Sequence, residues 1–424
     1  MGEILFLAHR IPFPPDRGDK IRSHHLLKAL AGQGPVHVGC FADTDDDRTQ
    51  EDNLAMLAAS HCLVERSKPL WRAGAEAVLS GKPVSLTAFY HSRLRRWVQE
   101  TLSRFEIDTI FVFSGQMGQY IPDSFSGRVI VDLCDVDSAK FEAYGKNGAW
   151  PRRLVDAREG PLLAKEEARL ARRADHVLLI SDNEAGLFRS RIGEPEGVTI
   201  DVLRNGIDAE FFNPSLPDLT RHGSKDAIFD GPGPHCIFTG QMDYAPNIAA
   251  AMRVIGHILP ALRKTFSDAQ FHVIGRAPTA QLRAYDGREG VRIWGAVPDM
   301  RPFLAHSDCV LAPLEIARGV QNKVLEAMAM ARPIVLTPGA ATGIDAHDGK
   351  QFHVADSNAE LLRRIQAVLS DRQAAQAMGT AAREYVIRHQ SWPAMLATLP
   401  YLLGRQDGRQ DGRQGQTAGR RNAA

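Results

Sequence analysis

The chain has 424 residues, with 51 Lys and Arg against 50 Asp and Glu, and a formal net charge of +1. This length exceeds the size at which a single hydrophobic core stops growing, so two domains are expected. The even balance of charges argues against a dedicated nucleic-acid binder.

The cysteines and the hydropathy pattern bear on the compartment. No Cys-x-x-Cys pair occurs, and the five cysteines are scattered: Cys40, Cys62, Cys134, Cys236 and Cys309. This usage predicts a reducing compartment and no zinc site. The N-terminal apolar run, residues 4–8, is too short for a signal peptide, and no stretch approaches the roughly 18 apolar residues of a membrane span. We therefore expect a cytoplasmic protein.

In the N-terminal half, short apolar runs alternate with helical patterns. This alternation predicts a parallel sheet covered on both faces. The expected strands are residues 4–8, 36–41, 109–113, 128–133 and 177–180, with a further apolar run at 198–203. The expected helices include residues 20–32, 94–105 and 152–173.

A second alternating series follows a stretch rich in Pro, Gly, Asp and Ser. We expect a first domain at residues 1–207, a linker at 208–234 and a second domain at 235–387. The strands expected in the second domain are residues 236–239, 271–274, 291–294, 309–311 and 334–336. The tail, residues 404–424, repeats Gly-Arg-Gln-Asp with almost no apolar side chains and is predicted to be disordered.

The predicted fold class is α/β, with two doubly wound Rossmann-like domains facing a central cleft. Open parallel sheets bind ligands at the carboxyl ends of their strands, so the loops at those ends carry the candidate site. The first such loop contains Gly18 and opens a helix, and glycine lets backbone approach a ligand closely. The alternative is a solvated loop in which Asp19 caps the helix.

Carboxylates gather after the strand at residues 128–133. Asp135 and Asp137 form an Asp-x-Asp pair, which hard divalent cations accept as ligands. The alternative is that Asp137 or Ser138 caps the next helix and Asp135 lies in a loop. We favour a polar, ligand-facing loop without a metal.

The loop after the first strand of the second domain corresponds to the glycine turn of the first. It contains Gly240, Gln241 and Asp243, and Pro246 with Asn247 opens the next helix. Phosphate or base contacts are one interpretation of this loop, and an ordinary strand-to-helix connection is the other.

Residues 318–338 are the most informative stretch, because they predict a polar loop, an amphipathic helix and a buried strand. Asn322, Lys323 and Glu326 fall near the start of the helix, where free backbone N–H groups and the helix dipole favour an anion such as a diphosphate. A carboxylate accepts hydrogen bonds from hydroxyl groups such as those of a ribose. The stretch therefore predicts a sugar-nucleotide pocket.

These motifs together resemble family-4 retaining glycosyltransferases of the GT-B fold, and more narrowly the sugar transferases associated with exosortase (PEP-CTERM) exopolysaccharide systems. The matching stretches are residues 10–20, 131–140, 205–208, 240–247 and 319–329. The resemblance implies that a C-terminal helix, at about residues 388–403, crosses back to complete the first domain.

The resemblance also implies roles for single residues. Glu326 would contact the nucleotide ribose. The family's other glutamate, eight positions earlier, is replaced by Arg318, and Gln241 and Asn247 stand where Arg and Lys are usual. We predict that Arg318 and Lys323 supply the positive charge that stabilises the leaving diphosphate. The other expected donor contacts are Gly319, Gln321, Asn322, Gly240, Gln241, Asp243, Gly18, Asp19 and Lys20.

On the acceptor side, Asp135 and Asp137 are expected to act in catalysis, and Arg22 and Lys140 to contact the acceptor. The resemblance implies that the acceptor hydroxyl attacks on the face from which the diphosphate leaves, without enzyme nucleophile, metal or cofactor. The expected partners are a nucleotide sugar and a glycan or lipid-linked acceptor, but no nucleic acid. Two alternatives are a non-catalytic nucleotide-sugar-binding subunit, because of Arg318, and a sugar-nucleotide epimerase or hydrolase.

Residues 93–98 form a basic and aromatic stretch, with Trp71, Phe89 and Tyr90 nearby in the sequence. One interpretation is peripheral contact with anionic lipid at the inner face of the cell membrane. The other is a solvated helix face.

Overall fold

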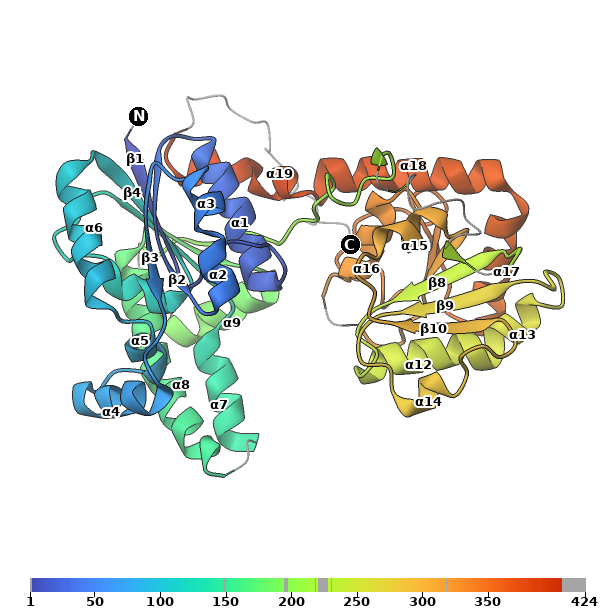
Figure 1. Ribbon diagram of the computed structural model, residues 1–424, viewed down its shortest axis with the longest axis horizontal. Coiled ribbons are helices and arrows are strands. Elements are labelled where there is room, and N and C mark those ends of the chain that lie inside the picture. The colour runs from blue at the N-terminus through green and yellow to red at the C-terminus, as the bar shows by residue number, and fades with distance from the viewer. Residues whose placement is uncertain are drawn as a thin grey trace, which may run out of the picture. The chain divides into compact units, whose positions relative to one another are not determined.

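The computed structural model describes residues 2–147, 150–193, 197–217, 219, 228–229, 231–317 and 319–405. They form two compact units (Figure 1). The first unit extends to Arg204 and also contains the segment from Leu396 on, and the second is Asn205–Met395. Residues 406–424 of the predicted tail and much of the predicted linker lie outside the described residues.

The first unit is built on a parallel sheet. In the described part of the chain, this sheet has seven strands in the order β3-β2-β1-β4-β5-β6-β7, so the direction of winding reverses between β1 and β4. Most of these strands were predictable because they are near-continuous runs of buried apolar residues. The strands are β1 (Glu3–Ala8), β2 (Val36–Ala42), β3 (Ser60–Glu65), β4 (Ile107–Phe113), β5 (Arg128–Cys134), β6 (His176–Leu179) and β7 (Ile200–Val202).

Helices cover both faces of this sheet, with α1 on one side and α6 on the other (Figure 1). This is the arrangement that a parallel sheet requires to bury both of its faces. The helices are α1 (Gly18–Ala31), α2 (Asp45–Thr49), α3 (Glu51–Ala55), α4 (Leu70–Ser80), α5 (Val84–Ala88), α6 (Ser92–Arg104), the 3₁₀ turn η1 (Gly115–Tyr120), α7 (Asp137–Asn147), α8 (Arg152–Arg173) and α9 (Asp182–Ile192).

The second unit repeats the plan with a smaller sheet. Its described strands number six, in the order β10-β9-β8-β11-β12-β13, all parallel, and the winding reverses between β8 and β11. The strands are β8 (His235–Thr239), β9 (Gln270–Ile274), β10 (Val291–Gly295), β11 (Cys309–Ala312), β12 (Ile334–Leu336) and β13 (His353–Val354). The helices are α12 (Ala245–Arg253), the π-helical turn η2 (Val254–Ile258), α13 (Leu259–Leu262), α14 (Ala280–Arg283), α15 (Arg301–His306), α16 (Asn322–Ala329), α17 (Asn358–Ser370), α18 (Arg372–His389) and α19 (Trp392–Met395).

The structure differs from the sequence prediction at two strands and at the C-terminal helix. Strands β3 and β13 were not predicted, because each is a sheet edge with polar residues in a short run. The helix predicted near residues 388–403 is interrupted after α18. It continues as α19, the 3₁₀ turn η3 (Leu396–Thr398) and α20 (Leu399–Leu402). Pro393 and Pro400 lie in the first turns of α19 and α20, where a proline cannot continue a preceding helix.

The passage between the units also has a clear local structure. Ile207 belongs to the buried core of the second unit and forms an isolated bridge with Ser391.

No helix in the described ranges is long and apolar enough to cross a membrane.

Candidate functional site

In the second unit, the loops that follow β8 and β11 leave neighbouring strands at the point where the winding reverses. This is where open α/β sheets bind their ligands. The first loop carries Gly240 and Gln241 and leads into α12, and the second carries Gly319 and Gln321 and leads into α16. The helices that these loops open contact each other through Lys323 and Asn247.

Two glycines allow the strand ends to approach each other. Gly240 has φ +154° and Gly275, directly after β9, has φ +149°, and a Cβ on Gly275 would overlap the carbonyl oxygen of Gly240. A Cβ on Gly240 would lie 2.8 Å from Nδ2 of Asn247 and 2.9 Å from Nζ of Lys323. The bare Gly240 backbone therefore faces a lysine ammonium and an amide, without a side chain in between.

Lys323 is held in place by contacts from the β8 side of the sheet. Its Nζ donates to Oδ1 of Asn247 at 2.5 Å and lies 4.7 Å from the centre of the Phe238 ring. Nδ2 of Asn247 in turn donates to the carbonyl oxygen of Gln241 at 2.9 Å, and Arg276 donates to Oε1 of Gln241 at 2.9 Å. The result is a cationic cluster at the ends of β8 and β9.

Burial changes the protonation of two groups on α16. Burial lowers the pKa of Lys323 to about 8, although Glu326 opposes the change. Burial likewise raises the pKa of Glu326 to about 7, against the attraction of Lys323. Both groups therefore titrate near neutral pH and are held in a partly desolvated place, as expected for groups that bind a ligand.

The N-terminus of α16 adds a further attraction for anions. Its N-cap residue is Gln321, and no described side chain caps the helix there. The first N–H groups of a helix and its dipole favour negative charge. Together with Lys323, this end of α16 is suited to a diphosphate.

The remaining predicted residues of the second unit lie on the same loops. Asp243 and Asn322 are exposed, and Gly319, with φ +67°, accepts a hydrogen bond on its carbonyl oxygen from Gln321 at 3.0 Å. Arg318 lies outside the described residues. The predicted charge swap between Arg318 and the usual glutamate therefore stays a prediction.

In the first unit, Asp19 belongs to an ion-pair network at the ends of β1 and β2. Its carboxylate lies 2.8 Å from Arg10, 3.1 Å from Arg17 and 3.2 Å from His9. Burial alone would raise the pKa of Asp19, but the hydrogen bond from His9 and the charges around it hold that pKa well below its usual range. The N-cap position of α1 is Arg17, so the alternative in which Asp19 caps the helix is wrong.

Gly18, the first residue of α1, shows neither a left-handed backbone nor a close neighbour at its Cβ position. It therefore contributes open space rather than a special turn.

Two predicted ligand contacts are corrected by the structure. Lys20 is buried and pairs with Asp47 at 2.5 Å and with the carbonyl oxygen of Phe13 at 3.1 Å. Arg22 is fully buried and makes two hydrogen bonds to Asp132, at 2.8 and 3.1 Å. Buried charges need such partners. Both side chains therefore hold the first unit together instead of facing a donor or acceptor.

Asp135, Asp137 and Lys140 do lie together at the end of β5. Nζ of Lys140 is 2.7 Å from Asp135 and 3.3 Å from Asp137. Glu167 accepts hydrogen bonds from both the backbone N–H and the Oγ of Ser138, so a distant carboxylate satisfies one N–H of the first turn of α7. Among the described residues no group of three or more His, Cys, Asp or Glu could hold a metal ion. Lys140 offsets part of the negative charge of the carboxylate pair.

Sequence reasoning missed Phe238, Gly275 and Arg276. Phe238 was predicted only as part of the strand at residues 236–239. A glycine followed by an arginine directly after the strand at residues 271–274 is the signal that could have indicated Gly275 and Arg276. Their contacts with Gly240 and Gln241 depend on β8 and β9 being neighbours in the sheet.

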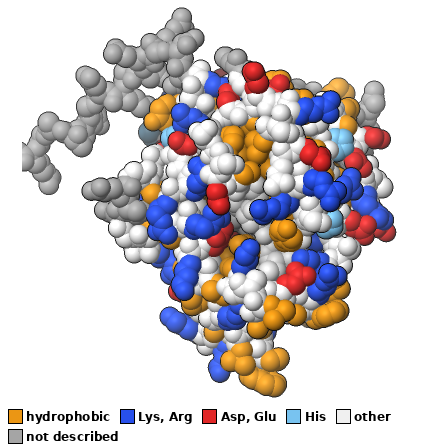
Figure 2. Space-filling view, turned by 90° about the vertical axis from the view of Figure 1, so that its left-hand side faces the viewer, with side chains coloured by type: hydrophobic (Ala, Val, Ile, Leu, Met, Phe, Trp, Pro, Cys, Tyr) orange, Lys and Arg blue, Asp and Glu red, His pale blue; other side chains and the backbone are white. Residues whose placement is uncertain are grey.

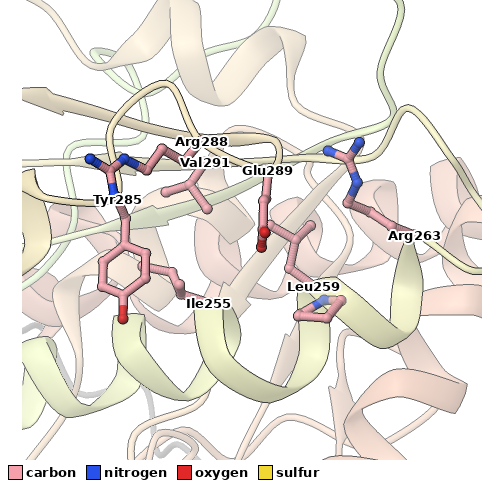
Figure 3. Close-up of a pocket in the computed structure, with 8 residues that line it drawn as sticks. Ile255, Leu259, Arg263, Tyr285, Arg288, Glu289 and Val291 are labelled. Carbon is pink, nitrogen blue, oxygen red and sulfur yellow. The ribbon is translucent and has the colours of Figure 1, made fainter.

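A separate surface cavity of about 370 Å³ lies elsewhere in the second unit (Figure 3). Figure 3 shows Tyr285 and Arg288 on one side and Leu259 and Arg263 on the other, with Glu289 between them. None of the Gly240, Asn247, Lys323 and Glu326 cluster lines this cavity.

A match to a known protein family covers part of the second unit. Residues 233–371 match the family described as glycosyl transferases group 1. The matched segment is about a third of the chain and contains every residue of the Lys323 cluster. No curated protein matches the sequence.

Solved structures resemble the whole chain. HepE from Anabaena, determined in complex with UDP-glucose, is 16% identical, covers 96% of this chain and 100% of its own, and superimposes with a TM-score of 0.57. Sucrose-phosphate synthase from Thermosynechococcus elongatus is 15% identical over 96% of this chain and 99% of its own, with a TM-score of 0.57. WaaG, a glycosyltransferase involved in lipopolysaccharide biosynthesis, is 17% identical over 95% and 100%, with a TM-score of 0.55.

These likenesses establish the fold. The chain has the GT-B fold, with two Rossmann-like domains built on parallel sheets. The predicted fold class is confirmed in this respect.

Proposed function

We propose that the protein is a retaining glycosyltransferase that moves a sugar from a nucleoside diphosphate donor to a glycan or lipid-linked acceptor. The observation that carries the proposal is the cluster of Gly240, Asn247, Lys323 and Glu326 where the winding of the second sheet reverses. The match of residues 233–371 to glycosyl transferases group 1 supports it. So does the fold shared with HepE, which binds UDP-glucose.

In this proposal the cluster binds the donor. The Lys323 ammonium and the N-terminal N–H groups of α16 contact the diphosphate, which can approach because Gly240 has no side chain. Glu326 accepts hydrogen bonds from the ribose hydroxyls in its ionised form. A bound diphosphate raises the pKa of Lys323 and donated hydroxyls lower the pKa of Glu326, so ligand binding favours the charged form of both groups.

The transfer step requires no protein nucleophile. The acceptor hydroxyl oxygen forms a bond to the anomeric carbon while the bond from that carbon to the diphosphate oxygen breaks. The hydroxyl proton passes to a phosphate oxygen of the leaving group. Lys323 stabilises the negative charge that develops on the diphosphate, with Arg318 proposed as a second cation, so no metal is needed in this scheme.

The acceptor is proposed to meet the first unit near Asp135, Asp137 and Lys140, which form a compact polar group. A place in exopolysaccharide biosynthesis, in family 4, follows only from the sequence resemblance. The cytoplasm, with contact at the inner face of the cell membrane, is the proposed location.

Donor binding is tested by isothermal titration with UDP-, GDP-, ADP- and CDP-sugars. We expect one nucleotide class to bind, and Glu326→Gln and Lys323→Met each to weaken that binding at least tenfold. Glu384→Gln, at an exposed α18 glutamate that pairs with Arg388, is the matched control and leaves affinity unchanged. Absence of binding to all four classes would refute the proposed donor site.

Transfer is tested separately from binding. Incubation of the bound donor with membrane extract or candidate glycans yields a glycosylated product under the proposal. Release of free sugar at the same rate with and without acceptor would indicate a hydrolase, and an isomerised donor would indicate an epimerase. Donor binding without any turnover across acceptors would favour the non-catalytic subunit.

A further inference from the structure

The first unit exposes an unusual number of large apolar side chains on two neighbouring helices. On α4, Trp71 is 76% and Leu79 is 89% exposed, and just before α8 Trp150 is 77% exposed. Single exposed apolar residues need no explanation, but a group of them does. We call this group the α4–α8 apolar surface: Leu70, Trp71, Val78, Leu79, Trp150 and Leu154.

Helix α4 does not bury its large apolar side chains, as an amphipathic helix on a domain surface usually does. Its buried positions are two alanines, Ala73 and Ala77, which pack against the unit. At 100° per residue, Trp71, Val78 and Leu79 lie on the side away from these alanines and face solvent. Helix α4 therefore buries its smallest apolar residues and leaves its largest ones exposed to solvent.

The start of α8 continues this surface. Arg158 donates to the carbonyl oxygens of Ala77, at 2.8 Å, and Lys82, at 3.2 Å, which fixes α8 beside the end of α4. Leu154 lies four residues earlier, on the same side of α8 as Arg158, which is the side that contacts the end of α4. The six apolar residues therefore belong to one end of the first unit.

Basic residues surround this apolar end. Lys82, Arg152 and Arg153 are exposed beside it, and Arg152 lies 3.9 Å from the buried Asp156. The nearby Glu76 is paired with Lys68 and with the exposed Arg72. Hydrophobic side chains gather at the lower end of the face in Figure 2, with Lys and Arg beside them, and α4 and the start of α8 lie at the lower end of this unit in Figure 1. Such a charge pattern complements an anionic surface.

We propose that the α4–α8 apolar surface docks into the interface of an anionic lipid membrane. The two tryptophans suit the headgroup region, because their rings are apolar with one polar edge. The aliphatic side chains enter the acyl boundary, and the arginines and lysine contact lipid phosphates. The surface differs from the stretch at residues 93–98 considered from sequence, because Leu94 and Val98 of that stretch are buried in the core.

That this docking brings the enzyme to a lipid-linked acceptor rests on the proposed function, whereas membrane binding itself does not. The two can fail independently. A protein that binds vesicles but no nucleotide sugar would retain the docking surface and lose the proposed activity.

The test is co-sedimentation of the purified full chain with vesicles of phosphatidylglycerol and phosphatidylcholine, compared with phosphatidylcholine alone. We expect binding to the anionic vesicles that weakens as salt is raised. Trp71→Ser combined with Leu79→Ser lowers the partition coefficient about tenfold or more. Arg152→Gln combined with Arg153→Gln lowers binding to anionic vesicles and reduces its salt dependence.

The matched control is Met56→Ser, at a residue 75% exposed after α3 and outside the surface. All of these side chains are exposed, so the variants are expected to keep the melting temperature and donor affinity of the wild type. Failure of the wild type to bind anionic vesicles, or equal binding by Trp71→Ser/Leu79→Ser, would overturn the proposal. A protein partner for the same surface would be the remaining explanation.

Discussion

Replacing Glu326 with Gln tests whether the partly desolvated carboxyl of Glu326 lowers the free energy of unfolding. Burial raises the pKa of Glu326 from an ordinary 4.5 to about 7. Between these two values the folded protein holds a proton that the unfolded chain has lost, so stability falls as pH rises. Relative to a carboxyl with an unshifted pKa, the raised pKa destabilises the folded state by about 1 kcal/mol at pH 5 and about 3 kcal/mol at pH 8.

Glutamine does not titrate and leaves this penalty out. We therefore expect Glu326→Gln to be more stable than the wild type at pH 8, and the difference to shrink by about 2 kcal/mol on going to pH 5. The same variant should bind the donor more weakly, because the ribose hydroxyls lose an ionised acceptor. Opposite effects on stability and on binding are characteristic of a functional group.

The assay is urea unfolding followed by intrinsic fluorescence at pH 5, 6, 7 and 8, for the wild type, Glu326→Gln and Glu384→Gln. The Glu384 side chain is 58% exposed, so its variant should show a small difference that does not change with pH. A Glu326→Gln curve parallel to that of the control would show that Glu326 is an ordinary surface carboxylate. The reasoning about the half-buried Lys323 and Glu326 would then be wrong.

Three further predictions concern Lys323, Gly240 and Arg22. Because burial lowers the pKa of Lys323 to about 8, Lys323→Met should stabilise the protein by about 2–3 kcal/mol at pH 7, and this gain should shrink above pH 8. The donor affinity of the wild type should also fall above pH 8. Urea unfolding measures the first effect and titration calorimetry across pH measures the second. Gly240→Ala should displace the Lys323 ammonium, which lies 2.9 Å from the position of the new Cβ. The variant should bind the donor more weakly and lose about 1–3 kcal/mol of stability. Unchanged donor affinity would contradict a close approach of the diphosphate to the Gly240 backbone. Arg22→Met should destabilise the first unit by about 3–5 kcal/mol, because Asp132 is left buried and unpaired, and Arg22→Met/Asp132→Leu should recover much of the loss in thermal unfolding.

The sequence by itself determined the architecture, because the relevant signals are local. Alternation of short apolar runs with helical periods placed β1, β2 and most later strands to within a few residues, and α8 at its observed bounds. It also placed Lys323 and Glu326 at the start of α16. These features depend only on residues within one or two turns of each other.

Only the tertiary structure decided which charged side chains are free to meet a ligand. Lys20 and Arg22 share a loop and helix with Asp19, but their partners are Asp47 and Asp132, 27 and 110 residues away. The pairing of Lys323 with Asn247, 76 residues apart, requires β8 and β11 to be neighbours in the sheet. Strand order is set by long-range packing, and it decides which oppositely charged residues become neighbours in space. A buried charge therefore pairs with a residue that the local sequence does not identify.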